Sequence, residues 1–298
     1  MIDSATTGNF GAVLIDWDSY DFPVFRPLDR FDEAEHLRYM AAHDLIESYL
    51  SKSMIIFVRE ESLRLVNYLH GIGTAMQRDG RVAPTDADGL NIRDAIAAHV
   101  LAVANAYFVY REQRREQAKQ LSEQRDDDTW DQVKIHLDAL YEGCAAYRWL
   151  VESRNALVHL DLMGTVLLRL SIATSREPMI ELRLARRTIL QTRNMNQRNM
   201  AAYREELESL SDDPAVLDLL KEVLPVIAET DKQVRKAMYP ANVLGDAATT
   251  VRELIGRFHG QEGTYCLQTG PGFTEEHRIP QHIRLSVEVL EFARTYPH

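Results

Sequence analysis

One short stretch of the chain holds three side chains that could handle a phosphate group. It reads Val-Glu-Ser-Arg-Asn-Ala-Leu-Val-His and contains Arg154, Asn155 and His159. An imidazole with a pKa near ~6.5 can take or give a proton at neutral pH, and a guanidinium binds oxyanions through two parallel hydrogen bonds. In a helix, Asn155 and His159 share a face because they lie four residues apart. These three residues are therefore the candidate site.

The residues before this stretch predict a single long helix, from about Thr129 to about Leu160. Apolar side chains recur there in steps of three and four and form a heptad-like seam. Continuing the register puts Arg154 and Val158 on the seam. A buried, unpaired guanidinium is costly, so Arg154 should be ion-paired, lie at a subunit interface or line a cleft. The seam consists of Trp130, Val133, Leu137, Leu140, Cys144, Tyr147 and Val151.

At these residues the chain resembles the HEPN (higher eukaryotes and prokaryotes nucleotide-binding) superfamily of helical bundles. The signature of that superfamily is Arg, usually followed by Asn, Asp or His, and then His after four to six intervening residues. Here it reads R-N-A-L-V-H over residues 154–159. The resemblance covers about residues 90–240. It implies metal-independent RNA cleavage without a cofactor, catalysed by Arg154, Asn155 and His159, as in toxins and phage-defence effectors.

RNA cleavage also suits the chemistry of these side chains. Attack of a ribose 2′-OH on its own phosphate needs one proton taken and one given, which a His can do. Negative charge builds up on the phosphoryl oxygens, and Arg154 could stabilise it. One His and one Arg are few for both proton steps. The resemblance implies a homodimer that pairs two motifs, and the seam could form its interface or be internal core.

Other short motifs have simpler explanations. Arg93-Asp94…His99 follows the same pattern, but it places His99 on the apolar stripe of its helix, which is typical of a core histidine. One Glu-x-x-His, Glu33 to His36, lacks the second pair that a di-iron bundle needs. Asp126, Asp127 and Asp128 are typical of a helix N-terminus. We therefore expect no metal and no cofactor.

A basic segment follows the motif. Between Arg169 and Arg204 there are eight arginines and two acidic residues, so the segment carries +6 while the remainder of this −11 chain carries −17. The pattern predicts a helix from about Ala185 to Leu210. Arg183, Arg187 and Arg198 would lie near one face of it. Together with Arg193 they are the candidate RNA-binding residues. The alternative is a solvated helix face paired with acidic neighbours.

Composition and periodicity predict a mostly α-helical bundle. Apolar residues make up 45% of the chain, and Gly and Pro are scarce. The period changes to two in one place, which predicts a small β-hairpin around residues 166–184. Residues 1–28 are expected to be irregular and residues 260–280 to be a loop. The predicted organisation is an N-terminal region (1–89) packed on the HEPN-like bundle (90–240) and a C-terminal extension (241–298), as one compact unit.

The sequence also limits the setting. Two cysteines exclude a disulfide framework. Without a signal-peptide pattern or an apolar stretch long enough to cross a bilayer, we expect a cytoplasmic protein and no membrane partner. The expected partners are RNA, a second copy of the chain and an antitoxin or other defence-system protein. Two alternatives remain: a non-catalytic helical protein that binds RNA, nucleotide or a protein partner, and a structural subunit in which Arg154 is ion-paired with an acid such as Glu152.

Overall fold

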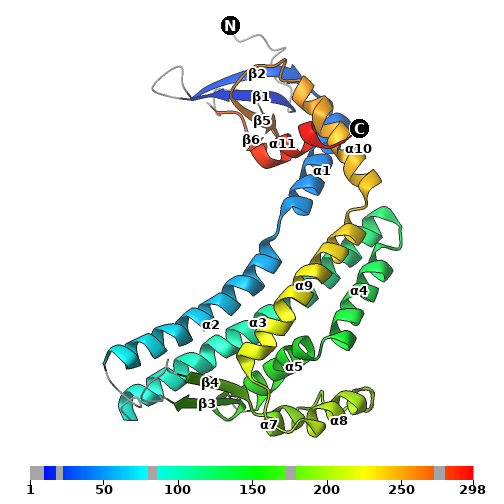
Figure 1. The fold of residues 1–298 in the computed structure, drawn as a ribbon. Helices are drawn as coiled ribbons and strands as arrows, with labels where there is room; N and C mark the ends of the chain where they lie inside the picture. The colour runs from blue at the N-terminus through cyan, green and yellow to red at the C-terminus, as the bar shows by residue number, and fades with distance from the viewer. Residues whose placement is uncertain are drawn as a thin grey trace. The chain divides into compact units, whose positions relative to one another are not determined.

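The structure, a computed structural model, describes residues 10–17, 23–79, 86–160, 162–171, 179–271 and 279–297. The chain divides into two compact units (Figure 1). Unit 2 is one continuous segment, residues 53–238, whereas unit 1 combines residues 1–52 with residues 239–298. The division after Met238 lies within two residues of the expected boundary at residue 240. The expected boundary at residue 89 instead falls inside unit 2, so the N-terminal region is shared between the two units.

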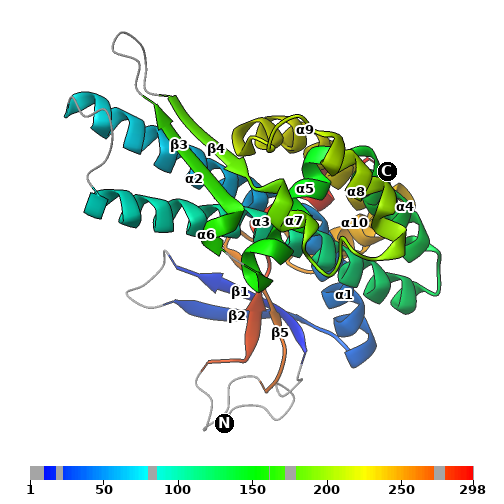
Figure 2. The same ribbon diagram turned by 90° about the horizontal axis from the view of Figure 1, so that it is seen from below.

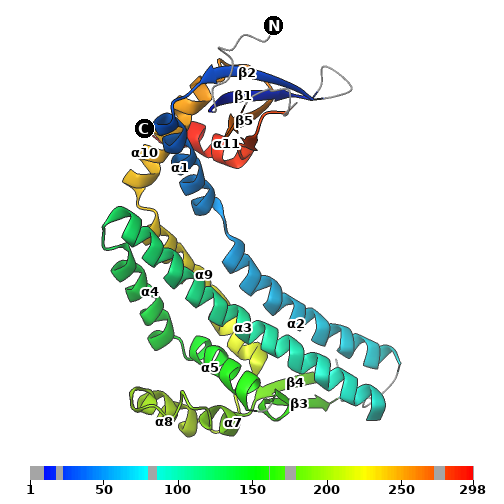
Figure 3. The ribbon, with the colours of Figure 1, turned by 180° about the vertical axis from the view of Figure 1, so that it is seen from behind.

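Unit 2 is a helical bundle. Long helices α2 and α3 pack against each other, and α4, α5 and α9 pack on α3 and on one another (Figure 3). The mostly helical fold predicted from the periodicity is confirmed. Apolar side chains of α3, such as Ile96, Val103 and Tyr107, are fully buried in the bundle. The bounds are α2 (Ser53–Arg78), α3 (Asp86–Arg125), α4 (Thr129–Gly143), α5 (Ala145–His159) and α9 (Val216–Met238).

The predicted hairpin is also confirmed. After the short helix α6 (Leu162–Thr165), β3 (Val166–Ser171) pairs antiparallel with β4 (Met179–Leu184). The two strands contact α2 and α3 (Figure 2). The turn expected at residues 175–178 lies outside the described residues.

The single helix predicted over residues 129–160 is wrong, because it is broken at Cys144. Cys144 has extended backbone angles, φ −118° and ψ 100°, and separates α4 from α5. Gly143, the residue before it, has low helix propensity and ends α4. The apolar seam nevertheless stays inside: Val133, Leu140 and Tyr147 are all buried within one chain. The seam is therefore internal core on both sides of the break.

The helix predicted over residues 185–210 is also wrong. It is replaced by α7 (Arg186–Leu190), a series of turns, a 3-10 turn η2 (Arg198–Met200) and α8 (Ala201–Ser209). Polar side chains bond the local backbone in the turns: Thr192 Oγ1 accepts from Met195 N at 3.3 Å, and Asn196 Nδ2 donates to Thr192 O at 3.0 Å. Such bonds compete with the helical ladder, so Arg183, Arg187 and Arg198 do not share one helix.

Unit 1 contains a four-stranded antiparallel sheet that the sequence patterns do not predict. Its order is β2-β1-β5-β6, so strands from both ends of the chain are neighbours. Parts of the regions expected to be irregular (1–28) and loop-like (260–280) are therefore strands. The strands are β1 (Gly11–Asp16), β2 (Val24–Arg30), β5 (Thr264–Gln268) and β6 (His282–Arg284), and the helices are α1 (Glu33–Leu50), α10 (Ala241–Gly256) and α11 (Val287–Thr295).

The helices of unit 1 cover one face of this sheet. Ala12 and Leu14 of β1 belong to a core cluster with residues of α1, α10 and α11. On the opposite face Val13, Ile15 and Cys266 form a second small cluster against Phe25. Both faces of β1 are thus buried, and the strand reads as a continuous apolar run.

One arginine joins three parts of unit 1. Arg257, just after α10, forms ion pairs with Asp29 of β2 at 3.0 Å and with Glu35 of α1 at 2.6 Å. Its Nε also donates to Tyr39 Oη at 3.4 Å. The hydrogen bonds to Tyr39 and Asp29 raise the pKa of Arg257.

In the described part of the chain, one helical segment, Gly89–Arg125 of α3, is long and apolar enough to cross a membrane. Several of its apolar residues, such as Ile96 and Val103, are buried against other helices of the bundle.

Candidate functional site

Helix α5 carries all three residues of the motif. Arg154 and Asn155 are half-buried, whereas His159, the last residue of the helix, is exposed. Val158, which the heptad register had placed on the seam, is 46% exposed. The register prediction is therefore wrong at its last position, because this turn of α5 buries Ala156 and Leu157 instead.

The Arg154 guanidinium lies on an aromatic ring and is not ion-paired with any described carboxylate. Its Cζ is 4.7 Å from the centroid of the Phe108 ring of α3. Its Nη1 donates a long hydrogen bond, 3.4 Å, to Asn155 Oδ1. Its Nε is buried and has no hydrogen-bond partner. A cation–π contact holds the guanidinium in place without cancelling its charge, so Arg154 keeps its capacity to bind an anion.

The nearest carboxylate along α5, Glu152, is occupied by neutral donors. Its side chain is buried, and it accepts from Tyr141 Oη at 2.7 Å, from Asn194 Nδ2 at 2.5 Å and from Asn155 Nδ2 at 3.3 Å. The ion pair between Arg154 and Glu152 that one alternative required is therefore absent from the described contacts. A buried carboxylate needs its acceptor sites filled, and here Tyr141 and the two Asn side chains fill them.

This network also determines how the Asn155 amide is turned. An ionised carboxylate only accepts hydrogen bonds, so Asn155 must present Nδ2 to Glu152. Its Oδ1 then points to Arg154. Asn194 is a site residue that the sequence pattern does not indicate, and Glu152, expected as a possible ion-pair partner of Arg154, accepts from neutral donors instead. Asn194 lies 42 residues from Glu152 along the chain, in turns where the periodicity predicts a helix.

A second arginine of α5, Arg148, is structural. Its side chain is buried and ion-paired with Glu206 of α8 at 2.5 Å, and it donates to Tyr141 O and Glu142 O. Tyr141 lies between this arginine and Glu152. Burial and the Glu152 charge raise the pKa of Tyr141, so the phenol stays protonated and donates to Glu152 at all ordinary pH values.

His159 is separate from this network. No hydrogen bond or ring contact joins it to another described residue. The structure therefore brings Arg154 and Asn155 together and leaves His159 at the surface. It is flanked by two exposed apolar side chains, Val158 and Leu160, the latter 49% exposed.

The four candidate RNA-binding arginines differ in their surroundings. Arg183 of β4 donates to Glu181 Oε1 and to Asp213 O at 2.6 Å, so its charge is largely satisfied. Arg187 of α7, Arg193 in the turns and Arg198 of η2 are exposed and form no ion pair with a described residue. Three separate elements thus present the cations that remain available, in place of the single helical strip predicted.

The second Arg…His pair behaves as a structural one. The His99 ring lies 4.7 Å from that of Tyr68 on α2 and is half-buried, while Arg93 is exposed. His99 therefore packs against α2, but it is not fully buried as a core histidine would be.

The described residues contain one group with metal-ligand spacing, His43, Asp44 and Glu47 in unit 1. His43 Nε2 accepts from Ser286 N at 3.1 Å, and Nδ1 lies 3.3 Å from Asp44 Oδ1. If Nε2 accepts, Nδ1 carries the proton, and neither nitrogen has a lone pair for a metal. His36, of the Glu-x-x-His motif, is buried and stacked on Phe10 at 4.4 Å, with Nδ1 unpartnered. The donor sets therefore do not fit a metal centre.

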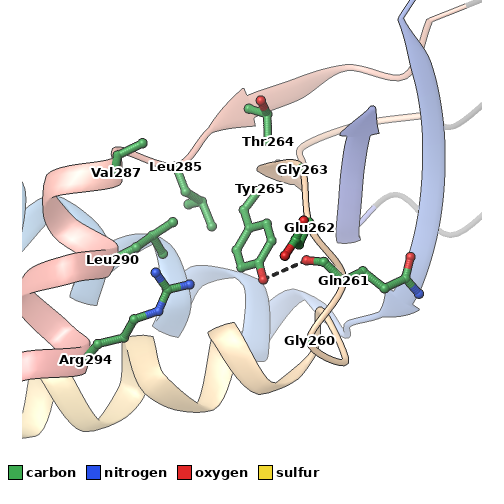
Figure 4. Close-up of a pocket in the computed structure, with 10 residues that line it drawn as sticks. All are labelled: Gly260, Gln261, Glu262, Gly263, Thr264, Tyr265, Leu285, Val287, Leu290 and Arg294. Carbon is green, nitrogen blue, oxygen red and sulfur yellow. Dashed lines mark hydrogen bonds between the residues drawn. The ribbon is translucent and has the colours of Figure 1, made fainter. Parts of the chain in front are cut away.

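Among the hollows lined by described residues, two lie away from the motif. One, of about 340 Å³ in unit 1, is floored by Leu285, Leu290 and the Tyr265 ring and edged by Glu262 and Arg294 (Figure 4). Tyr265 Oη donates to Gln261 O across its side at 3.0 Å. The other, of about 540 Å³ in unit 2, lies between α4 and α9 where α4 ends. Neither includes a residue of the motif.

The comparisons with known proteins give no relatives. No protein-family model matches the chain, and no curated protein sequence or solved structure matches it either. The site is therefore interpreted from its own residues.

Proposed function

We propose that the protein is a metal-independent endoribonuclease of HEPN type, with its site at the end of α5. One observation carries the proposal: Arg154 is half-buried, is held on the Phe108 ring and is ion-paired with no described carboxylate. The Arg154 guanidinium lies five residues before an exposed His on the same helix. A guanidinium that is held on a ring and has no ion pair is suited to bind an RNA phosphate. A toxin or phage-defence effector would use such an activity.

Each residue of the motif has a distinct role in this proposal. Arg154 stabilises the negative charge on the phosphoryl oxygens during attack of the 2′-OH. Asn155 orients the guanidinium through its Oδ1. His159 transfers protons at the 2′-OH or the leaving oxygen. The exposed Arg187, Arg193 and Arg198 bind flanking phosphates, and this binding should weaken as salt increases.

A homodimer would supply the second His and Arg that the two proton steps need. The seam cannot form the interface, because it is buried inside each chain. The exposed Val158 and Leu160 beside His159 instead favour an interface at the end of α5. Exposed apolar side chains around polar site residues are typical of contact surfaces.

The test compares wild type with His159→Ala and Arg154→Ala on the same RNA in the presence of EDTA. Loss of the His should lower the cleavage rate by ~10²–10⁴-fold and abolish formation of the 2′,3′-cyclic phosphate. Arg187→Ala should mainly weaken binding and flatten its salt dependence. Equal cleavage by wild type and His159→Ala, or cleavage only after a divalent metal is added, would refute the assignment.

Non-catalytic binding of RNA or nucleotide is the second candidate. The observation that favours it is the separation of His159 from Arg154 and Asn155, since no contact links the imidazole to the guanidinium. In that case Arg154→Ala would abolish RNA binding, His159→Ala would leave it unchanged, and wild type would leave the RNA intact.

A further inference from the structure

A second arginine lies beside Arg154 in the same electrostatic situation. Arg111 of α3 is half-buried, with its Cζ 5.1 Å from the centroid of the Tyr141 ring. Like that of Arg154, its Nε is buried without a hydrogen-bond partner. It is ion-paired with no described carboxylate.

The two guanidiniums are linked by a closed ring of contacts. Arg154 lies on Phe108, which precedes Arg111 by three residues and so shares its face of α3. On the other side Arg154 bonds Asn155, Asn155 bonds Glu152, Glu152 bonds Tyr141, and Tyr141 lies under Arg111. The ring joins α3, α4 and α5, so Arg111 and Arg154 border the same small surface.

Other arginines nearby are ion-paired with carboxylates. Arg114 is paired with Asp231 at 2.8 Å, Arg115 with Glu112 at 3.6 Å and Arg148 with Glu206 at 2.5 Å. In this region acidic side chains therefore neutralise the arginines that serve the fold. Within the described residues Arg111 and Arg154 are left with aromatic rings as partners, and the only carboxylate of the ring, Glu152, is filled by neutral donors.

We propose that Arg111 and Arg154 together form an anion site that binds the phosphodiester backbone of single-stranded RNA. Two half-buried guanidiniums held on rings keep their donors oriented, so little rotamer freedom is lost on binding. The choice of RNA rests on the proposed function, whereas phosphate as the bound group follows from two guanidiniums beside a single carboxylate, Glu152, which leave the ring with a net positive charge. Arg111 is thus a binding residue outside the Arg…His motif.

The test uses full-length protein in a His159→Ala background, so that the RNA stays intact, and measures binding of a short labelled single-stranded RNA by anisotropy over a range of salt. Arg111→Met keeps the contact with Tyr141 and removes the charge. It should weaken binding about tenfold and reduce the slope of log K against log salt by ~0.7. Arg115→Met, one turn further along α3, is the matched control and should leave the RNA affinity and salt slope unchanged.

Two further variants check the reasoning. Arg111→Lys keeps the charge and should restore the salt slope. If both residues bind the same phosphates, the double variant Arg111→Met, Arg154→Met should lose less RNA-binding free energy than the sum of the losses in the two single variants. Circular dichroism and melting show whether each variant is folded.

The proposal is overturned if Arg111→Met, correctly folded, binds RNA as its parent does or loses no more than Arg115→Met. A parallel titration with ATP separates the two sources of phosphate, since dependence on Arg111 for ATP alone would overturn RNA as the ligand. Failure of the cleavage assay with intact, Arg111-dependent RNA binding would refute the nuclease and leave this site standing.

Discussion

At the scale of single residues, the site depends on which groups are left unpaired. Arg154 forms no ion pair with Glu152, because Glu152 accepts from Tyr141, Asn155 and Asn194 instead. The residue types and spacing of Arg154, Asn155 and His159 were visible in the sequence. The partners of Glu152 were not, because they come from three elements and one of them lies in turns that periodicity does not reveal.

Replacement of Glu152 by Gln should both destabilise unit 2 and weaken RNA binding. The Gln amide nitrogen would face donors, and Asn155 would lose the acceptor that fixes its orientation. Hydrogen bonds to a charged group contribute about 1.5–3 kcal/mol each, so urea unfolding should show a loss of roughly that size. Glu142→Gln, an exposed neighbour, is the control. If Glu152→Gln unfolds at the same urea concentration as Glu142→Gln, the network is not stabilising.

The stability of unit 1 should depend on pH through His36. Burial lowers the pKa of His36 below its ordinary 6.5, so between these two values the unfolded chain binds more protons than the folded one. The contribution of neutral His36 to the stability of unit 1 is present above about pH 6.5. It is lost as the pH falls toward the lower pKa that His36 has in the folded state.

This pH dependence is checked by unfolding unit 1 between about pH 7.5 and about pH 5, a range that includes the ordinary pKa of a His side chain, in wild type and His36→Phe. The Phe variant should lose less stability on acidification. His259→Asn is the control, since His259 is exposed and its φ of 52° suits Asn. Identical pH profiles for wild type and His36→Phe would contradict the prediction.

At the scale of elements, the sequence pattern predicts structure that depends on residues near one another along the chain. It does not predict the pairing of segments that are far apart in the sequence. The mostly helical character of unit 2 and the hairpin over residues 166–184 follow from short-range periodicity. The break at Cys144 was missed because apolar side chains on both sides of it keep the same spacing. The four-stranded sheet was missed because β1 is buried on both faces and pairs with β5 from the other end of the chain, so neither alternation nor a nearby partner was visible.

Replacement of Gly11 by Ala should destabilise unit 1. A Cβ there would lie 2.3 Å from Asp29 O on the paired strand β2, next to the register shift between Ala12 and Val13. Overpacking of this kind typically costs 1–3 kcal/mol, about a tenth or more of the stability of a domain. Gly256→Ala, where the new methyl meets nothing within 4 Å, is the control. Thermal unfolding with equal midpoints for the two variants would rule out the close approach.

At the scale of the whole molecule, the two units differ in how the chain builds them. Unit 2 uses residues 53–238 without interruption, whereas unit 1 needs segments from both sides of it. All residues of the candidate site and of the Arg111–Arg154 anion site lie in unit 2.

A fragment of residues 53–238 should therefore fold by itself. It has its own buried core, and we expect a helical circular dichroism spectrum, a cooperative melt and RNA binding within about threefold of the full chain, a difference below ~1 kcal/mol. Full-length protein lacking residues 10–30 should keep the unit 2 transition and lose that of unit 1, because β1 and β2 form half of its sheet. A fragment that is unfolded or does not bind RNA would show that unit 2 depends on unit 1.

The pairing of β1 with β5 also sets an order of events during synthesis. The two strands are separated by the entire bundle, so β1 leaves the ribosome long before its partner exists. At typical translation speeds of ~5–20 residues per second, the wait is on the order of 12–50 s. Strand β1 has four apolar residues directly before Asp16. During the wait, β2 is the only one of its two neighbouring strands that has been synthesised. A chaperone that binds short apolar segments would find β1 accessible until translation reaches β5, and a ribosome stalled within the bundle would leave it accessible for good.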